Sequence, residues 1–158
     1  MAYYFFDSSA LVKYYVGETG TQWVQGLIDA QSQGVLANEI SIAHVTGAEI
    51  VAAISRRAKI GLTSASDSAK AIGVFNTHFQ TKYRVLLVSL ETVEGAMSLA
   101  EKHTLRGYDA IQLAAVLLLE EEMTISGIGP LILISADIEL NQAAQAEGLL
   151  TDDPNQHP

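Results

Sequence analysis

The sequence predicts an α/β fold in three layers, in which a central, mostly parallel sheet carries helices on both faces. Short apolar runs alternate along the chain with longer helical stretches. The runs "YYFF", "RVLLVSL" and "LILIS" are apolar almost throughout, which is typical of parallel strands buried on both faces. With 158 residues, 49% hydrophobic and 17% charged, the chain is expected to form one domain over residues 1–158.

The first half of the chain is expected to begin with a strand over Tyr3–Phe6, because this aromatic run is short and ends at a polar turn. A helix follows, with Ser8 or Ser9 as its N-cap. The remaining expected elements are a helix ending near Gly34, a short strand over Val35–Ala37, and helices over Ser41–Lys59 and Thr63–Lys82, the last with Ala69, Ile72, Phe75 and Phe79 on one face.

In the second half, Arg84–Leu90 is the clearest candidate for a central strand. A buried strand is expected at Leu131–Ser135 and an edge strand at Leu149–Thr151. The tail, residues 151–158, is expected to fray. The expected helices are Glu91–Lys102, Tyr108–Met123 and Ile138–Glu147.

Composition narrows the function classes. The chain has no cysteine, so it forms neither disulfides nor thiolate metal sites. No apolar run approaches the ~20 residues that span a membrane, and the first residues lack a basic region, which favours a cytoplasmic protein. The formal charge of −9 argues against a nucleic-acid partner, unless several acids converge on a pocket that binds cations.

Four acids stand beside apolar or small residues. Asp7 and Asp137 each follow a predicted strand and precede a predicted helix, and Asp109 lies in the first turn of its helix. An N-cap or a favourable helix dipole accounts for each of these three equally well. Glu49 is harder to explain structurally, since its helical neighbours are small or apolar. Those neighbours are Val45, Thr46, Ala52 and Ala53.

The predicted fold brings these acids together. Asp7 and Asp137 follow parallel strands, and the carboxyl ends of such strands form the ligand-binding edge of an open α/β sheet. Flanking helices can direct Glu49 and Asp109 to the same edge. Four clustered carboxylates repel one another, and a hard divalent cation such as Mg²⁺ or Mn²⁺, which prefers oxygen ligands, relieves that repulsion.

Other motifs are weaker. The chain has no phosphate-binding loop of the Walker type, and Ser8 and Ser9 lack the context of a catalytic nucleophile. A basic patch at a helix end is typical of dipole stabilisation, with phosphate contact as the alternative; it consists of Arg56, Arg57 and Lys59. The histidines show no metal-ligand spacing; they are His44, His78, His103 and His157.

Four segments in order resemble a PIN domain, and most closely the toxin ribonucleases of VapBC toxin–antitoxin pairs: "FFDSSALVKYY", "TGAEIVAAISRR", "LRGYDAIQLAAV" and "LISADIELNQAAQAEGL". The resemblance covers nearly the whole chain and implies a PIN-like three-layer sandwich. It also implies a catalytic and metal-binding site made of Asp7, Glu49, Asp109 and Asp137. Around that site it implies supporting hydroxyls at Ser135 and Ser8, candidate phosphate contacts at Lys13 and Arg106, and Glu139 as a stand-in for a further acid.

The same resemblance implies a function. It indicates an endoribonuclease that requires Mg²⁺ or Mn²⁺ and cuts single-stranded RNA. It also implies a homodimer, and inhibition by a small antitoxin that occupies the acidic cleft. Whether one or two metal ions bind, and which RNA is cut, stays open.

Two alternatives remain. A Mg²⁺-dependent phosphotransfer domain also places acids at strand ends, but it needs an Asp-x-Asp motif or paired early acids, and a lysine after a late strand. This chain has "DSS" and "LILISAD" at those places. The other alternative is a PIN fold that only binds or regulates. Four mutually repelling carboxylates argue against it, because unused they would only destabilise the fold.

Overall fold

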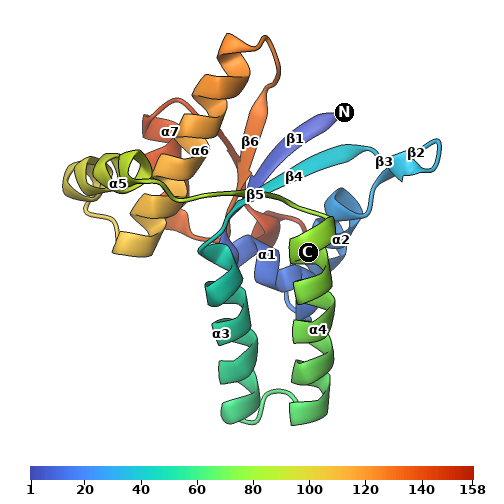
Figure 1. Cartoon of the computed structure of the whole chain (residues 1–158). Coiled ribbons are helices and arrows are strands. Elements are labelled where there is room, and N and C mark those ends of the chain that lie inside the picture. The colour runs from blue at the N-terminus through green and yellow to red at the C-terminus, as the bar shows by residue number, and fades with distance from the viewer.

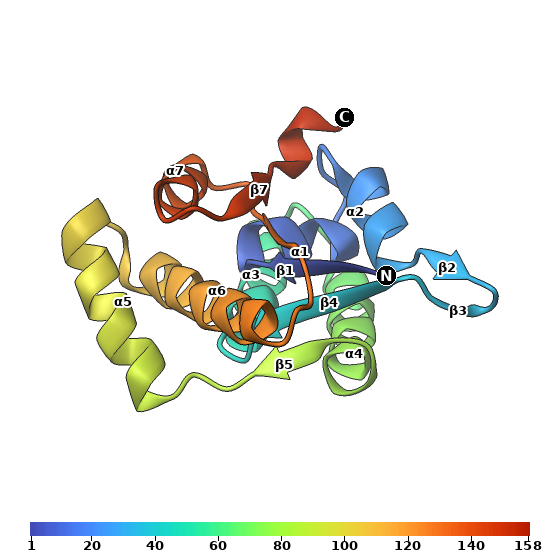
Figure 2. The ribbon, with the colours of Figure 1, turned by 90° about the horizontal axis from the view of Figure 1, so that it is seen from above.

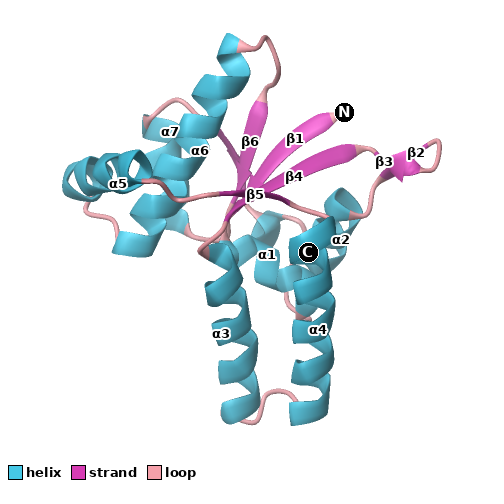
Figure 3. Ribbon diagram, viewed as in Figure 1, coloured by secondary structure: helices cyan, strands magenta, loops and turns pink.

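The computed structural model describes all residues, 1–158, and confirms the α/β fold with a parallel central sheet (Figure 1). Every pair of neighbouring strands in the five-stranded sheet is parallel, and the strand order is β5-β4-β1-β6-β7. The strands are β1 Ala2–Phe6, β4 Asn38–Ala43, β5 Arg84–Leu86, β6 Leu131–Ile134 and β7 Leu150–Asp152. Figure 3 shows the strands fanning out between two groups of helices.

Helices cover both faces of this sheet, as Figure 2 shows from above. One group comprises α1 Ser8–Tyr15, α2 Thr21–Ile28, α3 Thr46–Lys59 and α4 Ala65–Thr81. The other comprises α5 Leu90–His103, α6 Gly107–Ile125 and α7 Ile138–Ala146. A small hairpin of β2 Gln31–Ser32 and β3 Val35–Leu36, and a 3₁₀ turn, η1 Pro154–Gln156, complete the chain.

The alternation of side chains along each strand divides the core into two. Phe5 and Leu133 pack with α5, α6 and α7, whereas their neighbours Phe6 and Ile134 pack with α1 to α4. All four side chains are fully buried. Apolar residues at consecutive strand positions therefore find an apolar layer on either face, which explains the continuous runs.

The point of the sheet that matters for a site lies between β1 and β6. These two strands pair directly, with Tyr3 opposite Leu131 and Phe6 opposite Ile134. The helix after β1 packs on one face of the sheet, and the helix after β6 packs on the other. Their diverging connections leave a crevice at the carboxyl ends of the strands, where open α/β sheets bind ligands.

Two expectations for the first half of the chain were wrong. The helix expected from Ser41 starts only at Thr46, because residues 38–43 form β4 and place Ile40 and Ile42 in the core. The helix expected to reach Gly34 ends at Ile28 and is followed by the β2–β3 hairpin, whose turn has positive φ at residues 33 and 34.

Residues 84–90 do not form a central strand. Only Arg84–Leu86 pairs, at the edge of the sheet, and the side chain of Leu87 is 80% exposed. The chain turns away there because Ser89 caps α5, and its hydroxyl accepts a hydrogen bond from the Thr92 amide (3.2 Å). Of the face expected on α4, Phe75 is buried, but Ala69 is exposed.

The tail is docked rather than frayed. The expected edge strand is present as β7, and Pro154 after it is buried. The His157 ring stacks on Trp23 at 4.1 Å. Gly20, with a φ of 85°, makes this docking fit, since a Cβ there would lie 2.2 Å from the carbonyl oxygen of Pro154. No helix combines the length and apolar character that crossing a bilayer requires.

Candidate active site

Asp7 and Asp137 follow the carboxyl ends of β1 and β6, two strands that pair directly. Each caps the helix that follows it, which is one of the two interpretations that the sequence allowed: Asp7 Oδ1 accepts from the Ala10 amide (3.0 Å) and Asp137 Oδ1 from the Leu140 amide (2.9 Å). The cap of α1 is therefore Asp7, and neither Ser8 nor Ser9. Capping fixes the χ angles of both carboxylates at the crevice.

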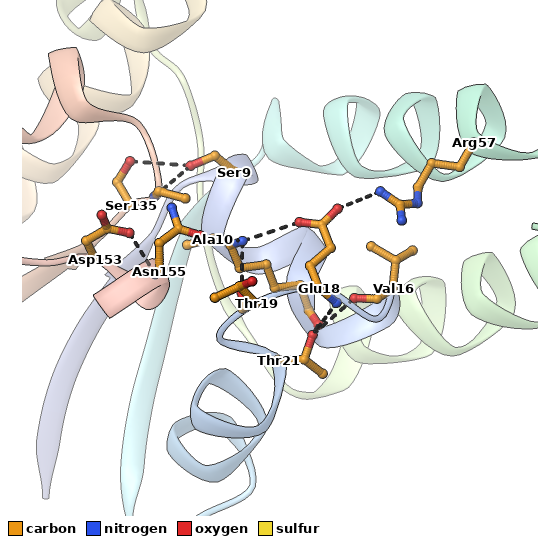
Figure 4. A network of polar contacts seen from close by, with 12 residues as sticks. Ser9, Ala10, Val16, Glu18, Thr19, Thr21, Arg57, Ser135, Asp153 and Asn155 are labelled. Atoms are coloured by element: carbon orange, nitrogen blue, oxygen red, sulfur yellow. Dashed lines mark hydrogen bonds and ion pairs between the residues drawn. The ribbon is translucent and has the colours of Figure 1, made fainter. Parts of the chain in front are cut away.

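Hydroxyl groups connect these two strand ends, as Figure 4 shows for Ser9 and Ser135. Ser9 donates to Asp7 Oδ1 (2.8 Å) and accepts from the Ala136 amide (2.9 Å). The two hydroxyls also lie 3.4 Å apart, a contact in which either of them can be the donor. Ser135 also accepts from the Asp137 amide (3.0 Å).

Glu49 is held from the other side by Gln112. The Gln112 amide nitrogen donates to Glu49 Oε2 and to Thr46 Oγ1, both at 2.9 Å. Gln112 is 1% exposed, and its buried oxygen has no hydrogen-bond partner. One polar residue in an apolar helix was visible in the sequence, but its partners in α3 were not, since they lie more than 60 residues away.

Two adjoining cavities open at this edge. The first, called here the acidic pocket, has a volume of ≈ 430 Å³ and is lined by Glu49, Arg106, Gly107, Tyr108, Asp109, Ile111 and Asp137. The second, called the outer groove, measures ≈ 440 Å³ and is lined by Ser8, Ser9, Val12, Ala48, Glu49, Ala52, Ala53, Arg56 and Tyr108. Glu49 and Tyr108 line both. Three of the four predicted acids thus meet in one pocket, and Asp7, only 2% exposed, does not line it.

Burial raises the pKa of three of these acids. It raises the pKa of Asp7 to about 7, against hydrogen bonds from Ala10, Ser9 and Ser135 that act to lower it. Burial also raises the pKa of Glu49, opposed by hydrogen bonds from Gln112 and Ser8 and assisted by the charge of Asp109.

The pKa of Asp109 is raised first by burial and then by the negative charges of Asp137 and Glu139, while Arg106 lowers it. Asp109 therefore senses two neighbouring acids and one neighbouring cation. The acidic pocket concentrates negative charge in a partly dry environment, which is the condition under which a cation binds favourably.

The donor set suits a hard divalent cation, since every acid offers carboxylate oxygen and no histidine lines the pocket. No three acidic or histidine side chains lie close enough to hold an ion among them as they stand. Binding an ion would therefore require the carboxylates to draw together. Glu49, Asp109 and Asp137 share the pocket.

The remaining predicted residues are placed as follows. Ser8 lines the outer groove beside Glu49, and Arg106 lines the acidic pocket. Glu139 is exposed on α7 and lines neither cavity. Lys13 takes a structural place instead of facing the crevice. It is buried, and its ammonium group contacts Glu18 (3.3 Å), the Thr19 carbonyl and Asn155 (both 3.0 Å).

The histidines are engaged elsewhere. His44 accepts from the Val88 amide (2.9 Å), His78 pairs with the Tyr15 hydroxyl (2.9 Å), and His103 contacts Glu147 (2.5 Å). None of them lines the acidic pocket or the outer groove. The sequence did not predict Tyr108 or Ser9 as site residues, yet both line a cavity. The one available signal was position, since each adjoins a predicted acid or serine in the chain.

Comparison with known proteins finds a matching family and similar folds. The family model described as "PIN domain" matches residues 4–146. A toxin–antitoxin complex from Klebsiella pneumoniae is similar at 19% identity and a TM-score of 0.60, covering 98% of each chain. VapC20 of Mycobacterium tuberculosis, described as a sarcin–ricin loop cleaving toxin, is similar at 16% identity and a TM-score of 0.61, covering 98% of this chain and 99% of that one.

A protein of Pyrobaculum aerophilum is similar at 18% identity and a TM-score of 0.61, covering 98% of this chain and 91% of that one. At these identities the solved structures show a shared fold. A comparison with curated protein sequences finds no match.

Proposed function

Because the chain belongs to the PIN domain family, we propose that it is a divalent-metal-dependent endoribonuclease that hydrolyses single-stranded RNA. The observation that carries this proposal is the meeting of Glu49, Asp109 and Asp137 in one pocket at the strand ends of the sheet. The description of VapC20 as a sarcin–ricin loop cleaving toxin supports the same reaction class for a protein of this fold. The cleavage assays described below also test the alternative, a PIN fold that only binds or regulates.

The cation we propose is Mg²⁺ or Mn²⁺, held by Asp7, Glu49, Asp109 and Asp137. When bound, such an ion supplies positive charge to the phosphate and lowers the pKa of water. The chain's own residues hold the ligands in place. Capping bonds to Ala10 and Leu140 orient the two strand-end aspartates, and Gln112 orients Glu49. Arg106 adds a cation at the pocket, where a phosphate would otherwise meet only carboxylates.

The ends of the RNA products test this proposal. With a bound cation to lower its pKa, a water molecule would be the nucleophile in place of the ribose 2′-hydroxyl. The products should then carry a 5′-phosphate and a 3′-hydroxyl, as read by end-labelling of a cleaved, unstructured oligonucleotide. A preparation of Asp109→Asn, purified identically, controls for contaminating nucleases. Products ending in a 2′,3′-cyclic phosphate would refute the proposed mechanism.

Gln112 should control the pH at which the site becomes active. Its hydrogen bond lowers the pKa of Glu49, so Gln112→Met should raise that pKa further and keep Glu49 protonated to a higher pH. We expect the acidic limb of the cleavage rate against pH to move upward, with activity at pH 7 lower by about 10- to 100-fold, as is usual when the partner of a metal ligand is removed. Gln80→Met, on the exposed side of α4, is the matched control. An unmoved pH profile would make Gln112 a packing residue only.

We also propose that a small antitoxin inhibits the enzyme by inserting an arginine into the acidic pocket, since a guanidinium fits carboxylates in a bidentate manner. The similar structure from Klebsiella pneumoniae is a toxin–antitoxin complex, which supports a partner of this kind. Co-expression with the product of a neighbouring gene should yield a stable complex without ribonuclease activity. A stable complex that still cuts RNA would contradict this placement of the inhibitor.

A homodimer is proposed as well. Helix α5 carries an exposed apolar stripe of Leu90, Val93 and Met97, spaced to lie on one face, and Leu87 precedes it. This stripe gives two copies a surface on which to associate. Light scattering should show a dimer for the wild type and a monomer for Met97→Glu, and a monomeric wild type would refute the proposal.

A further inference from the structure

The distribution of positive charge around the site is uneven. The chain has nine lysines and arginines, and six of them are in ion pairs: Lys13, Arg57, Lys70, Lys82, Arg84 and Lys102. Three form no ion pair: Arg56, Lys59 and Arg106. In a protein with a formal charge of −9, these are the cations left to meet an anionic ligand.

Two of the three free cations line the cavities at the strand ends. Arg106 lines the acidic pocket and Arg56 lines the outer groove. Lys59 lies three residues after Arg56, so it is a neighbour on the surface of α3. The adjacent Arg57 does not share this freedom, because it pairs with Glu18 at 2.5 Å, a contact shown in Figure 4.

The space between the two arginines is apolar and presents an aromatic ring. The outer groove is floored by small side chains of α1 and α3, which leave room for a flat group: Val12, Ala48, Ala52 and Ala53. Tyr108, which lines both cavities, is 56% exposed. Exposed tyrosines beside cationic grooves are the usual stacking platforms for unpaired bases.

We propose that the outer groove is a nucleotide track, in which Arg56 binds an RNA phosphate next to the one that is cut and Tyr108 stacks on the base between them. Arg106 binds the RNA strand at the acidic pocket, and Lys59 offers a further phosphate contact along α3. The proposal rests on the ribonuclease function proposed above and adds to it the residues that position the substrate. Single-stranded RNA suits the outer groove, because Arg56 and Arg106 each offer a cation to a phosphate and Tyr108 offers a face to a base.

The test is the salt dependence of RNA binding. The assay uses an unstructured, fluorescent RNA oligonucleotide with Mg²⁺ and the Asp7→Asn protein, in which cleavage should be absent. Each phosphate contact on a single strand contributes about 0.7 to the slope of log affinity against log salt. Arg56→Ala should therefore weaken binding roughly 10-fold at 50 mM KCl and lower the slope by about 0.7. Lys70→Ala removes a surface charge paired at 3.8 Å on α4, and should change neither value.

Tyr108 should behave differently from Arg56. Stacking on a base contributes about 1–3 kcal/mol, so Tyr108→Ala should weaken binding roughly 5- to 150-fold with no change in the salt slope. Tyr108→Phe keeps the aromatic face and should bind like the parent protein. The melting temperature of each variant is measured as well. If a residue served folding alone, a variant that melts like the parent protein would also bind RNA like it.

The outcomes separate this inference from the proposed function. If the wild type cleaves RNA but Arg56→Ala and Tyr108→Ala leave affinity and salt slope unchanged, the track is refuted and the ribonuclease stands. If the wild type fails to cleave yet the variants weaken RNA binding as expected, the track stands and the ribonuclease is refuted. Unchanged RNA binding together with a lost inhibitor complex would assign the groove to a protein partner and overturn the proposal.

Discussion

Replacing Asp109 with asparagine is expected to abolish RNA cleavage and leave the fold intact. Asp109 lies in the acidic pocket together with Glu49 and Asp137, in the first turn of α6, and is half-buried. The substitution keeps the size of the side chain and removes its charge. A bound cation supplies several kcal/mol of transition-state stabilisation, and about 1.4 kcal/mol is a factor of ten, so the rate should fall by about 10³-fold or more.

The matched control for this prediction is Glu121→Gln. It removes one negative charge from an exposed position on the same helix, and it should cut RNA at the wild-type rate. Cleavage is measured with Mn²⁺ and with EDTA, alongside a thermal melt that verifies folding. An Asp109→Asn protein with wild-type activity would remove Asp109 from the site and leave it as an ordinary helix-terminus residue.

Stability without metal should fall as the pH rises from about 4 to about 7, and Asp7 should cause most of this loss. Burial raises the pKa of Asp7 from 3.8 to about 7 in the folded chain, so the native state holds a proton that the unfolded chain releases. The stabilisation from the protonated Asp7 is fully present below about pH 4, and it is lost as the pH rises through the pKa that Asp7 has in the folded protein. For a group 2% exposed, this difference corresponds to on the order of 4 kcal/mol in the free energy of unfolding.

Asp7→Asn should therefore stabilise the metal-free protein at pH 8, although it should also eliminate cleavage. The asparagine oxygen can still accept from the Ala10 amide and the Ser9 hydroxyl, so the cap survives while the buried charge is gone. The melting temperature should rise by roughly 10 °C in EDTA, since about 1 kcal/mol shifts a domain of this size by 2–4 °C. For the wild type, a divalent metal ion at ~100 times its dissociation constant should raise the free energy of unfolding by about 2.7 kcal/mol.

Asp67→Asn, an exposed position in the first turn of α4, is the control and should move stability by no more than about 0.5 kcal/mol. A metal-free wild type whose stability does not change between pH 5 and pH 8, with Asp7→Asn less stable than it, would show that Asp7 is ionised and supported by its hydrogen bonds alone.

The sequence predicted the strand-end acids well because two independent signals coincide there. Asp7 and Asp137 follow apolar strands and precede helices, and both signals are local. The sheet order was not readable in the same way. Residues 84–90 are mostly apolar, yet only three of them pair, since partner choice depends on residues far along the chain.

Local signals also misled where two elements adjoin. Residues 41–43 of β4 have small or apolar side chains like those of α3, so the helical pattern concealed the strand. The bonds of Gln112 to α3, and of Lys13 to Asn155 near the end of the chain, depend on tertiary packing. For the same reason the tail was expected to fray, because nothing in "DDPNQHP" reveals the Trp23 ring on which it docks.

The pairing of β1 with β6 also determines when the molecule can assemble. Residue 3 pairs with residue 131, so β1 cannot pair with β6 until more than a hundred further residues have been made. Such distant pairings slow folding, because the entropy of closing the chain is lost before the contacts form. During synthesis, Asp7 emerges before Ser135 and Asp137 and can meet them only once they too have been made. A nascent chain that stops before β6 therefore lacks the crevice altogether, and the activity proposed here begins only after residue 137 has been made.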